Sequence, residues 1–295
     1  MKILTSVIPV GSYDLTKENI KDIINHSSVF RSSLNIFLAF SGPHRHQDHV
    51  QFLKDTEDQP ISDYVSSAVC NSASPGSGRN LGISRATTPY VCFWDDDDLP
   101  EPQAILEALN DKSVNRLYVF QYQIQQPFES PKSPPFRTMN LFELFFTPAI
   151  WRLAIPRQYL HGASFSDSLF GEDHEFLSCL LSQPISIKFV SESSYIYVRR
   201  PASLSHRRSI DGLLISLSGC IDLFEQSSCH RIARGISIIS LFMVALPLIF
   251  SREIGKDRHR ILLLLSRVLC TPTIFLALPL YFYFFFRSKV RQSGL

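Results

Sequence analysis

Apolar runs of strand length alternate with helix-like segments through the first two thirds of the chain. Runs rich in β-branched and aromatic residues occur at 3–10, 34–40, 61–70 and 90–94, and the segments 16–27 and 79–87 have the spacing or position of helices. This alternation predicts an α/β domain with a mostly parallel central sheet. In such sheets, ligands bind at the carboxyl ends of the strands.

Composition limits the size of the domain and the kind of partner. The chain has 295 residues, 45% of them hydrophobic, and a formal net charge of +2. That length allows one domain of about 200–250 residues and a smaller appendage. No long basic or acidic tail points to nucleic acid as a partner. The six cysteines lack the spacing of a zinc site, so we expect buried free thiols.

Four consecutive aspartates, Asp95 to Asp98, follow the apolar run that ends at residue 94. Adjacent carboxylates repel one another unless a cation compensates their charge. If the strand continues, alternate residues share a face, so Asp95 and Asp97 form one pair and Asp96 and Asp98 the other. Mg²⁺ and Mn²⁺ prefer such oxygen ligands, and either ion can neutralise a diphosphate. A solvated acidic turn is the alternative.

The surrounding segment "GSGRNLGISRATTPYVCFWDDDDLPEP" resembles the central motif of family 2 glycosyltransferases, and the resemblance extends from residue 3 to about residue 206. It implies a nucleotide-binding domain of the GT-A type and inverting, metal-dependent transfer from a nucleotide-diphosphate sugar. It assigns Asp95 and Asp97 to the metal and donor and Asp98 to a supporting role, while Asp96 is expected to face outside. Arg79 and Asn80 of the motif are expected at the donor site.

The second apolar run departs from the family pattern at its end. Ser41 and Gly42 stand where the family usually has an aspartate that binds the nucleotide base. We therefore expect base recognition from backbone groups at 9–12, beginning with Pro9, or from Arg79. Three histidines follow within 44–49, and we expect a solvated polar loop there because no fourth metal ligand has suitable spacing.

A second acidic motif, "FGEDHEF", spans residues 170–176 at the start of a predicted helix. Transfer with inversion needs a base that takes a proton from the acceptor hydroxyl. The resemblance assigns that role to Asp173, and gives Glu172 the orientation of the acceptor or the support of the helix end. An ordinary acidic helix N-terminus is the alternative. Trp151 is interpreted as an acceptor-stacking residue or as a core residue.

A basic segment, "YIYVRRPASLSHRR", follows at residues 195–208. Arg199, Arg200 and His206 are candidates for contact with the donor diphosphate, since guanidinium groups and imidazole suit phosphate oxygens. His206 also joins Asp95 and Asp97 in the predicted metal site. The other interpretation is a basic face that approaches anionic lipid headgroups.

The C-terminal part is strongly hydrophobic. Residues 235–250 carry no charge but number only sixteen, and Val268–Phe286 contains nineteen uncharged residues followed by a basic flank. About 20 apolar residues span a bilayer, so the second run predicts membrane attachment. A buried helical subdomain is the alternative for both runs. The predicted organisation is a GT-A domain at 1–210, a helical connector at 211–234 and membrane-associated helices at 235–295.

These features together predict a glycosyltransferase at the cytoplasmic face of the cell membrane. Its expected partners are a nucleotide-diphosphate sugar, a glycan or lipid-linked acceptor, membrane lipid, and Mg²⁺ or Mn²⁺, as in bacterial surface-polysaccharide assembly. One alternative is a catalytically inactive, membrane-tethered family member that serves as a partner subunit. The other is a nucleotidyltransferase, although "VIPVGSYDLT" lacks the Lys or Arg of a basic phosphate loop.

Overall fold

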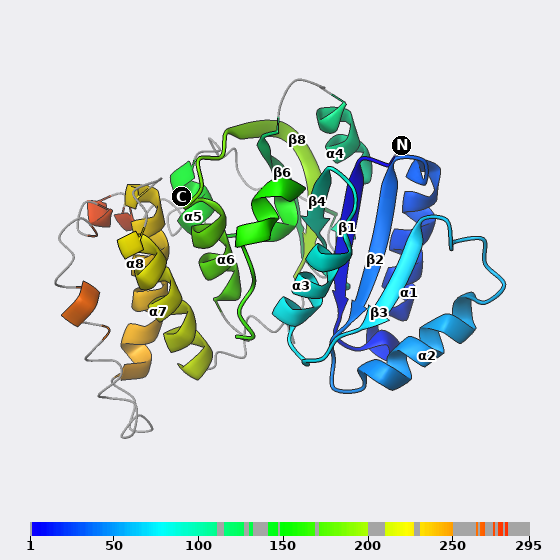
Figure 1. The fold of residues 1–295 in the computed structure, drawn as a ribbon, viewed down its shortest axis with the longest axis horizontal. Helices are drawn as coiled ribbons and strands as arrows, with labels where there is room; N and C mark the ends of the chain where they lie inside the picture. The colour runs from blue at the N-terminus through cyan, green and yellow to red at the C-terminus, as the bar shows by residue number, and fades with distance from the viewer. Residues whose placement is uncertain are drawn as a thin grey trace. The chain divides into compact units, whose positions relative to one another are not determined.

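The computed structural model describes residues 2–110, 115–126, 130–131, 141–146, 148–168, 171–199, 210–226 and 231–249, and isolated positions at 264, 266–268, 274, 277–279 and 281–282. The chain divides into two compact units (Figure 1). The first unit comprises residues 1–136, 150–167 and 185–203, and the second comprises 137–149, 168–184 and 204–295. Each unit is described by itself.

The first unit is built on a mixed sheet. In the described residues the strand order is β3-β2-β1-β4-β7-β6-β8-β5. The strands are β1 Leu4–Val10, β2 Leu34–Phe40, β3 Val65–Val69, β4 Tyr90–Phe93, β5 Leu99–Pro100, β6 Leu117–Gln125, β7 Leu153–Pro156 and β8 Ile187–Val198. β3, β2, β1 and β4 are parallel, as predicted. β7 runs antiparallel to β4 and β6, and β5 antiparallel to β8, so the sheet is less parallel than expected.

Helices cover both faces of this sheet. They are α1 Tyr13–Ser27, α2 Arg45–Thr56, α3 Pro75–Arg85 and α4 Pro102–Leu109, with 3₁₀ turns η1 Ser28–Phe30, η2 Ile150–Arg152 and η3 Arg157–Gly162. Ile8 belongs to a core that includes residues of α1 and α2. Its neighbour Val7 points to the opposite face, because side chains alternate along a strand. There a Cβ on Gly82 of α3 would lie 2.2 Å from Val7 Cγ1, so a glycine lets α3 pack closely on β1.

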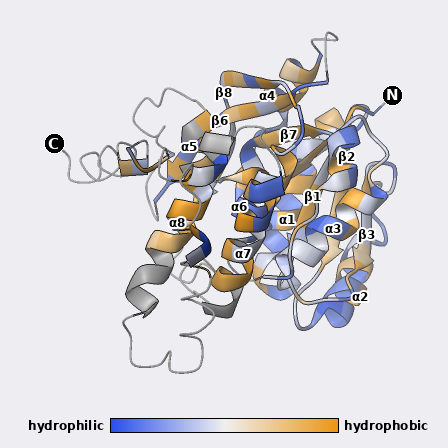
Figure 2. Ribbon diagram, turned by 60° about the vertical axis from the view of Figure 1, so that its left-hand side comes forward, coloured by the Kyte–Doolittle hydropathy of each residue, from blue (hydrophilic) through white to orange (hydrophobic). Residues whose placement is uncertain are grey.

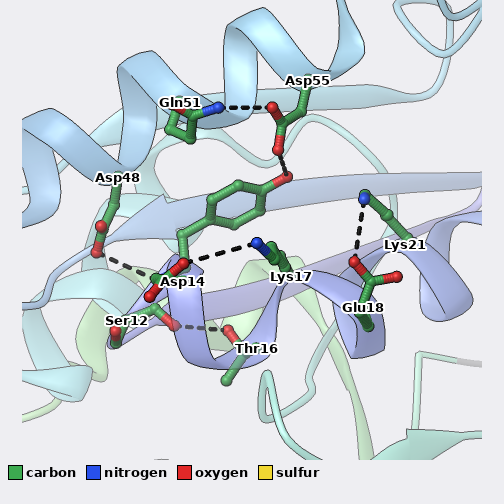
Figure 3. A network of polar contacts seen from close by, with 10 residues as sticks. Ser12, Asp14, Thr16, Lys17, Glu18, Lys21, Asp48, Gln51 and Asp55 are labelled. Atoms are coloured by element: carbon green, nitrogen blue, oxygen red, sulfur yellow. Dashed lines mark hydrogen bonds and ion pairs between the residues drawn. The ribbon is translucent and has the colours of Figure 1, made fainter.

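Helix α2 occupies the segment that was predicted to be a polar loop. Its buried residue is Phe52, so it lacks the apolar stripe from which a helix is usually predicted. Polar contacts attach it to α1 (Figure 3). Asp48 accepts the backbone N–H of Tyr13 at 3.2 Å, and the Tyr13 hydroxyl donates to Asp55 at 3.2 Å. These contacts fix the start of α1, which carries residues of the site described below.

The second unit is helical. It contains α5 Leu141–Phe146, α6 Glu172–Leu180, α7 Ile210–Gln226 and α8 Arg231–Ile249. α7 packs against α6 and α8, and α5 packs against α8. Figure 2 shows the predominantly hydrophobic colour of α7 and α8. Ile236, Ile239 and Leu241 of α8 are buried in this unit, so the described start of the apolar segment is covered by protein.

The predicted membrane attachment is therefore wrong. Within the part of the chain that the structure describes, no helix is long and apolar enough to cross a membrane. The hydrophobicity of α8 over its described side chains, 234–243, is explained by helix packing, the alternative noted for this segment. Most of the second run, 268–286, lies outside the described residues, and the described Val268, Ile274 and Tyr281 are buried. Two predictions are wrong here: the membrane-associated part of the fold class and the location at the membrane face.

Candidate functional site

The four aspartates form a turn at the carboxyl end of β4, which we call the acid turn (residues 95–98). The N–H of Asp98 donates to the carbonyl of Asp95 at 3.4 Å, so the chain bends here and does not continue as a strand. The predicted alternation of side chains fails for this reason. Asp96, expected to face outside, accepts the N–H of Gly11 at 3.0 Å and lies 3.2 Å from the hydroxyl of Thr16.

Helix α1 holds the backbone of the acid turn. The side-chain amide of Asn19 donates to the carbonyls of Asp96 and Asp98, both at 2.9 Å. Asp98 is 1% exposed, and its Oδ1 accepts the N–H of Val198 at 2.8 Å. The predicted supporting residue is thus buried between strands. Asn19 and Thr16 were missed from the sequence; their only signal is that two polar residues stand one turn apart on α1.

Asp95 is held by a cation and by a tyrosine. Arg79 Nη2 lies 3.0 Å from Asp95 Oδ1, and the Arg79 side chain is 6% exposed. The guanidinium also lies over the ring of Phe165, 5.3 Å from its centroid. The backbone N–H of Asp95 donates to the hydroxyl of Tyr195 at 2.9 Å. Arg79 therefore reaches the acid turn, as the donor-site prediction requires.

Asn80 binds the backbone of Phe165, whereas the preceding Arg79 binds Asp95. Its amide nitrogen donates to the carbonyl of Phe165, and its amide oxygen accepts the N–H of Phe165, both at 2.8 Å. The side chain thus clamps the segment that carries the ring beneath Arg79. In this structure Asn80 supports the site through Phe165, while the prediction that it contacts the donor stays a prediction.

The acid turn carries more negative charge than its surroundings compensate. Burial, followed by the charge of Asp97, raises the pKa of Asp96 from 3.8 to about 7. Burial, followed by the charge of Asp95, raises the pKa of Asp98 from 3.8 to about 8. Carboxyl groups with such pKa values are partly protonated near neutral pH. A cation in the turn would relieve this repulsion.

Trp151 lies in an aromatic cluster next to the acid turn. Its ring stacks on Tyr195 with centroids 4.5 Å apart and on Tyr197 at 5.8 Å, and Tyr122 meets it edge-on at 4.9 Å. Because the hydroxyl of Tyr195 binds Asp95, the cluster connects Trp151 to the acid turn. Stacking of an acceptor sugar on Trp151 stays a prediction.

The structure describes two of the four remaining donor-site candidates. Pro9 lies near the end of β1, where a Cβ on Gly78 would be 3.0 Å from Pro9 Cβ and 3.2 Å from the hydroxyl of Ser41. The ends of β1 and β2 therefore meet the first turn of α3. Arg199 donates its backbone N–H to Gln125 at 3.0 Å, and its side chain is exposed. Arg200 and His206 lie outside the described residues.

The second acidic motif belongs to the second unit. Glu172 and Asp173 form the first turn of α6 and are partly buried. Carboxylates are favoured there by the positive end of the helix dipole. For the metal, the described residues contain no group of three or more His, Cys, Asp or Glu side chains that could hold an ion. Asp95 and Asp97, both partly exposed, are the predicted ligands that the structure describes.

Comparison with known proteins identifies the domain. Residues 66–172 match the model of the glycosyl transferase family 2. The chain carries a family 2 glycosyltransferase domain. The matched segment of this glycosyltransferase begins in β3, contains Arg79, Asn80, the acid turn and Trp151, and ends at Glu172. No curated protein sequence matches the chain.

Solved structures share the fold of the glycosyltransferase at low sequence identity. S. aureus TarS 1–349 in complex with UDP-GlcNAc is 12% identical, with a TM-score of 0.64 over 90% of this chain and 79% of that one. The mannosyltransferase PcManGT from Pyrobaculum calidifontis, in complex with GDP-Man and Mn²⁺, is 11% identical, with a TM-score of 0.51 over 95% of this chain and 87% of that one. At these identities the likeness shows the fold.

Proposed function

We propose that the glycosyltransferase moves a sugar, with inversion, from a nucleotide-diphosphate donor to a hydroxyl of a glycan or lipid-linked acceptor. This proposal is supported mainly by the position and the contacts of the acid turn. It lies at the carboxyl end of β4, where ligands bind in α/β sheets. Three side chains from separate elements hold it: Asn19, Arg79 and Tyr195. Relatives in fold were solved with UDP-GlcNAc and GDP-Man, which supports a donor of this class.

The acid turn fits Mg²⁺ or Mn²⁺ when the ion is shared with the donor. Such ions take carboxylate oxygens, and Mg²⁺ commonly uses one or two protein carboxylates together with phosphate and water. The proposed ligands are Asp95 and Asp97, both partly exposed, whereas Asp96 and Asp98 accept hydrogen bonds from backbone N–H groups. When bound, the ion would neutralise the charge that grows on the diphosphate as the sugar leaves.

Asp173 supplies the base in this proposal. It takes the proton of the acceptor hydroxyl, whose oxygen forms a bond to the anomeric carbon on the face opposite the diphosphate. The bond between the anomeric carbon and the diphosphate oxygen breaks, so the configuration inverts. The start of α6 favours the ionised form of Asp173, which is the form a base needs. Glu172, beside it, is proposed to orient the acceptor.

A donor panel tests the function. The protein is incubated with UDP-GlcNAc, UDP-glucose or GDP-mannose, with Mn²⁺ or Mg²⁺ and a set of oligosaccharide acceptors, and release of UDP or GDP is measured. We expect wild type to consume at least one donor and Asp173→Asn to lose roughly 100-fold or more of the rate. The exposed acid Glu107 provides a matched control, Glu107→Gln, with wild-type activity expected.

Two results would contradict the proposal. If wild type consumes no donor under any condition, the chain is an inactive family member. If Asp173→Asn transfers sugar as fast as wild type, the base is another group.

A further inference from the structure

Helix α6 has one face that contacts α7 and α8, and Asp173 lies on the other. With 3.6 residues per turn, positions 171, 174, 175 and 178 share one side of the helix, and position 173 is on the opposite side. Each of those four positions has a close neighbour on α7 or α8 within the second unit. The predicted base is therefore flanked in sequence by residues that attach its helix to two others.

The first attachment is Gly171, which precedes the helix. Its φ of 84° lies in the left-handed region, which favours glycine. A Cβ here would lie 2.9 Å from the Cβ of Ser216 on α7 and 3.0 Å from Cδ2 of Leu241 on α8. Both the backbone conformation and the lack of space require glycine. The chain thus enters α6 at a fixed point against both helices.

The second attachment is His174. Its Nδ1 lies 3.1 Å from the hydroxyl of Ser237 on α8. Burial lowers the pKa of His174 to about 3, so the imidazole is neutral at physiological pH. A neutral imidazole can form this hydrogen bond with either ring tautomer, because a hydroxyl both donates and accepts.

The third attachment is Glu175, whose side chain lies directly over Gly219 of α7. A Cβ on Gly219 would be 2.5 Å from Glu175 Oε1 and 2.7 Å from Cδ. Burial raises the pKa of the neighbouring Cys220. Among the smaller effects, the hydrogen bond of Ser178 lowers it, the charge of Glu175 raises it and the charge of Arg234 lowers it. The carboxylate of Glu175 and the buried guanidinium of Arg234 therefore both lie near Cys220. One turn further on, the Ser178 hydroxyl lies 3.7 Å from the Cys220 sulfur.

We propose that Gly171, His174 and Glu175 are positioning residues that fix the first turn of α6 and thereby orient Asp173. This inference rests on the proposed function for the role of Asp173 as the base. A base must come within about 2.6–3.2 Å of the proton that it removes. A displacement of about 1 Å can reduce the rate about 100-fold. The three residues act through the helix and not by contact with substrate.

Gly219→Ala tests the third attachment because the added methyl group displaces the Glu175 carboxylate. We expect turnover to fall roughly 10- to 100-fold, with the donor Kd unchanged. Hydrogen exchange in the peptide 172–180, measured by mass spectrometry, is expected to become faster. In Gly219→Ala/Glu175→Asp the side chain is one methylene shorter, which makes room for the methyl group, so turnover and protection are expected to recover.

Gly235→Ala is the matched control within the same unit. There a Cβ would lie 3.1 Å from the Cβ of Ala277, a crowding that does not involve α6. It should change neither turnover nor exchange in 172–180. If Gly219→Ala does not fold, Ser237→Ala tests the second attachment, since it removes the partner of His174 and adds no volume. It should speed exchange in the same peptide and lower turnover severalfold.

The outcomes separate this inference from the proposed function. Wild-type exchange and turnover in Gly219→Ala, or equal changes in Gly235→Ala, would overturn the positioning role. Failure of Glu175→Asp to restore either quantity would also count against it. If exchange speeds as expected but Asp173→Asn keeps full turnover, then α6 is fixed as described and the base assignment fails.

Discussion

The guanidinium of Arg79 lies 3.0 Å from the carboxylate of Asp95 and over the ring of Phe165. The positive charge of Arg79 thus lies beside the acid turn before any ion binds. Arginine suits this position because its planar group can bind a carboxylate and stack on an aromatic ring at the same time. Lysine has the positive charge but lacks the planar group that binds and stacks in this way.

Removal of this cation should destabilise the protein. In Arg79→Met, Asp95 loses its partner beside three other acids, and we expect the free energy of unfolding to fall by roughly 1.5–3 kcal/mol. Arg79→Lys should lose part of that amount. Urea unfolding measures the change. Arg85→Met on the exposed side of α3 is the control, with a change within about 0.5 kcal/mol. Equal effects at the two arginines would contradict a special role for Arg79.

Asn80→Ala should act through Phe165. The substitution removes two hydrogen bonds of 2.8 Å to the backbone of Phe165, so we expect a loss of about 2 kcal/mol in unfolding free energy. Donor binding should weaken in the same variant, because the ring beneath Arg79 is no longer fixed. Thermal unfolding and donor titration check both. Weaker donor binding at unchanged stability would instead indicate direct contact between Asn80 and the donor.

Tyr195→Phe removes the hydrogen bonds of the Tyr195 hydroxyl to the acid turn, which involve the N–H of Asp95 and the side chain of Asp98. The substitution keeps the ring that stacks on Trp151 and removes the hydroxyl that accepts the N–H of Asp95. We expect a loss of about 1–3 kcal/mol in stability, since the N–H is left without that acceptor. Tyr197→Phe, whose ring stacks on the same indole, is the matched control. A larger effect at Tyr197 than at Tyr195 would contradict this interpretation.

Without metal, stability should fall as pH rises. The pKa values of Asp96 and Asp98 are raised from 3.8 to about 7 and about 8. Between about pH 4 and pH 8 the folded protein therefore binds more protons than the unfolded chain, so unfolding becomes easier as pH rises. Asp96→Asn should make the decline in Tm across this range shallower. A flat wild-type profile in EDTA would show that these carboxyl groups are not perturbed.

The local elements of the first unit could be predicted from the sequence. The run at 34–40 coincides with β2, and the helix expected at 16–27 is α1. The first is a nearly continuous apolar run of strand length, and the second has apolar residues at helical spacing. α2 has no such pattern and depends on contacts with α1, such as that between Asp55 and Tyr13, so it was missed.

The site was predictable in its residue types but not in its geometry. The run of aspartates indicated a cation and a diphosphate, whereas the turn that directs Asp96 toward Gly11 could not be read from spacing. The contact of Asn19 with the acid turn joins residues nearly 80 positions apart, and such contacts leave no local pattern. Hydropathy likewise does not distinguish a helical segment buried in protein, such as 234–239 of α8, from one buried in lipid.

We propose that the acid turn binds a donor diphosphate together with a divalent ion. The most direct test is calorimetric titration of wild type and Asp97→Asn with the donor that wild type consumes, in Mn²⁺ and in EDTA. Asp14→Asn, at a carboxylate that is 86% exposed, is the control. We predict binding that requires Mn²⁺ and is weaker by roughly tenfold or more in Asp97→Asn alone. Equally tight binding in EDTA, or in Asp97→Asn, would contradict a metal-dependent donor site at the acid turn.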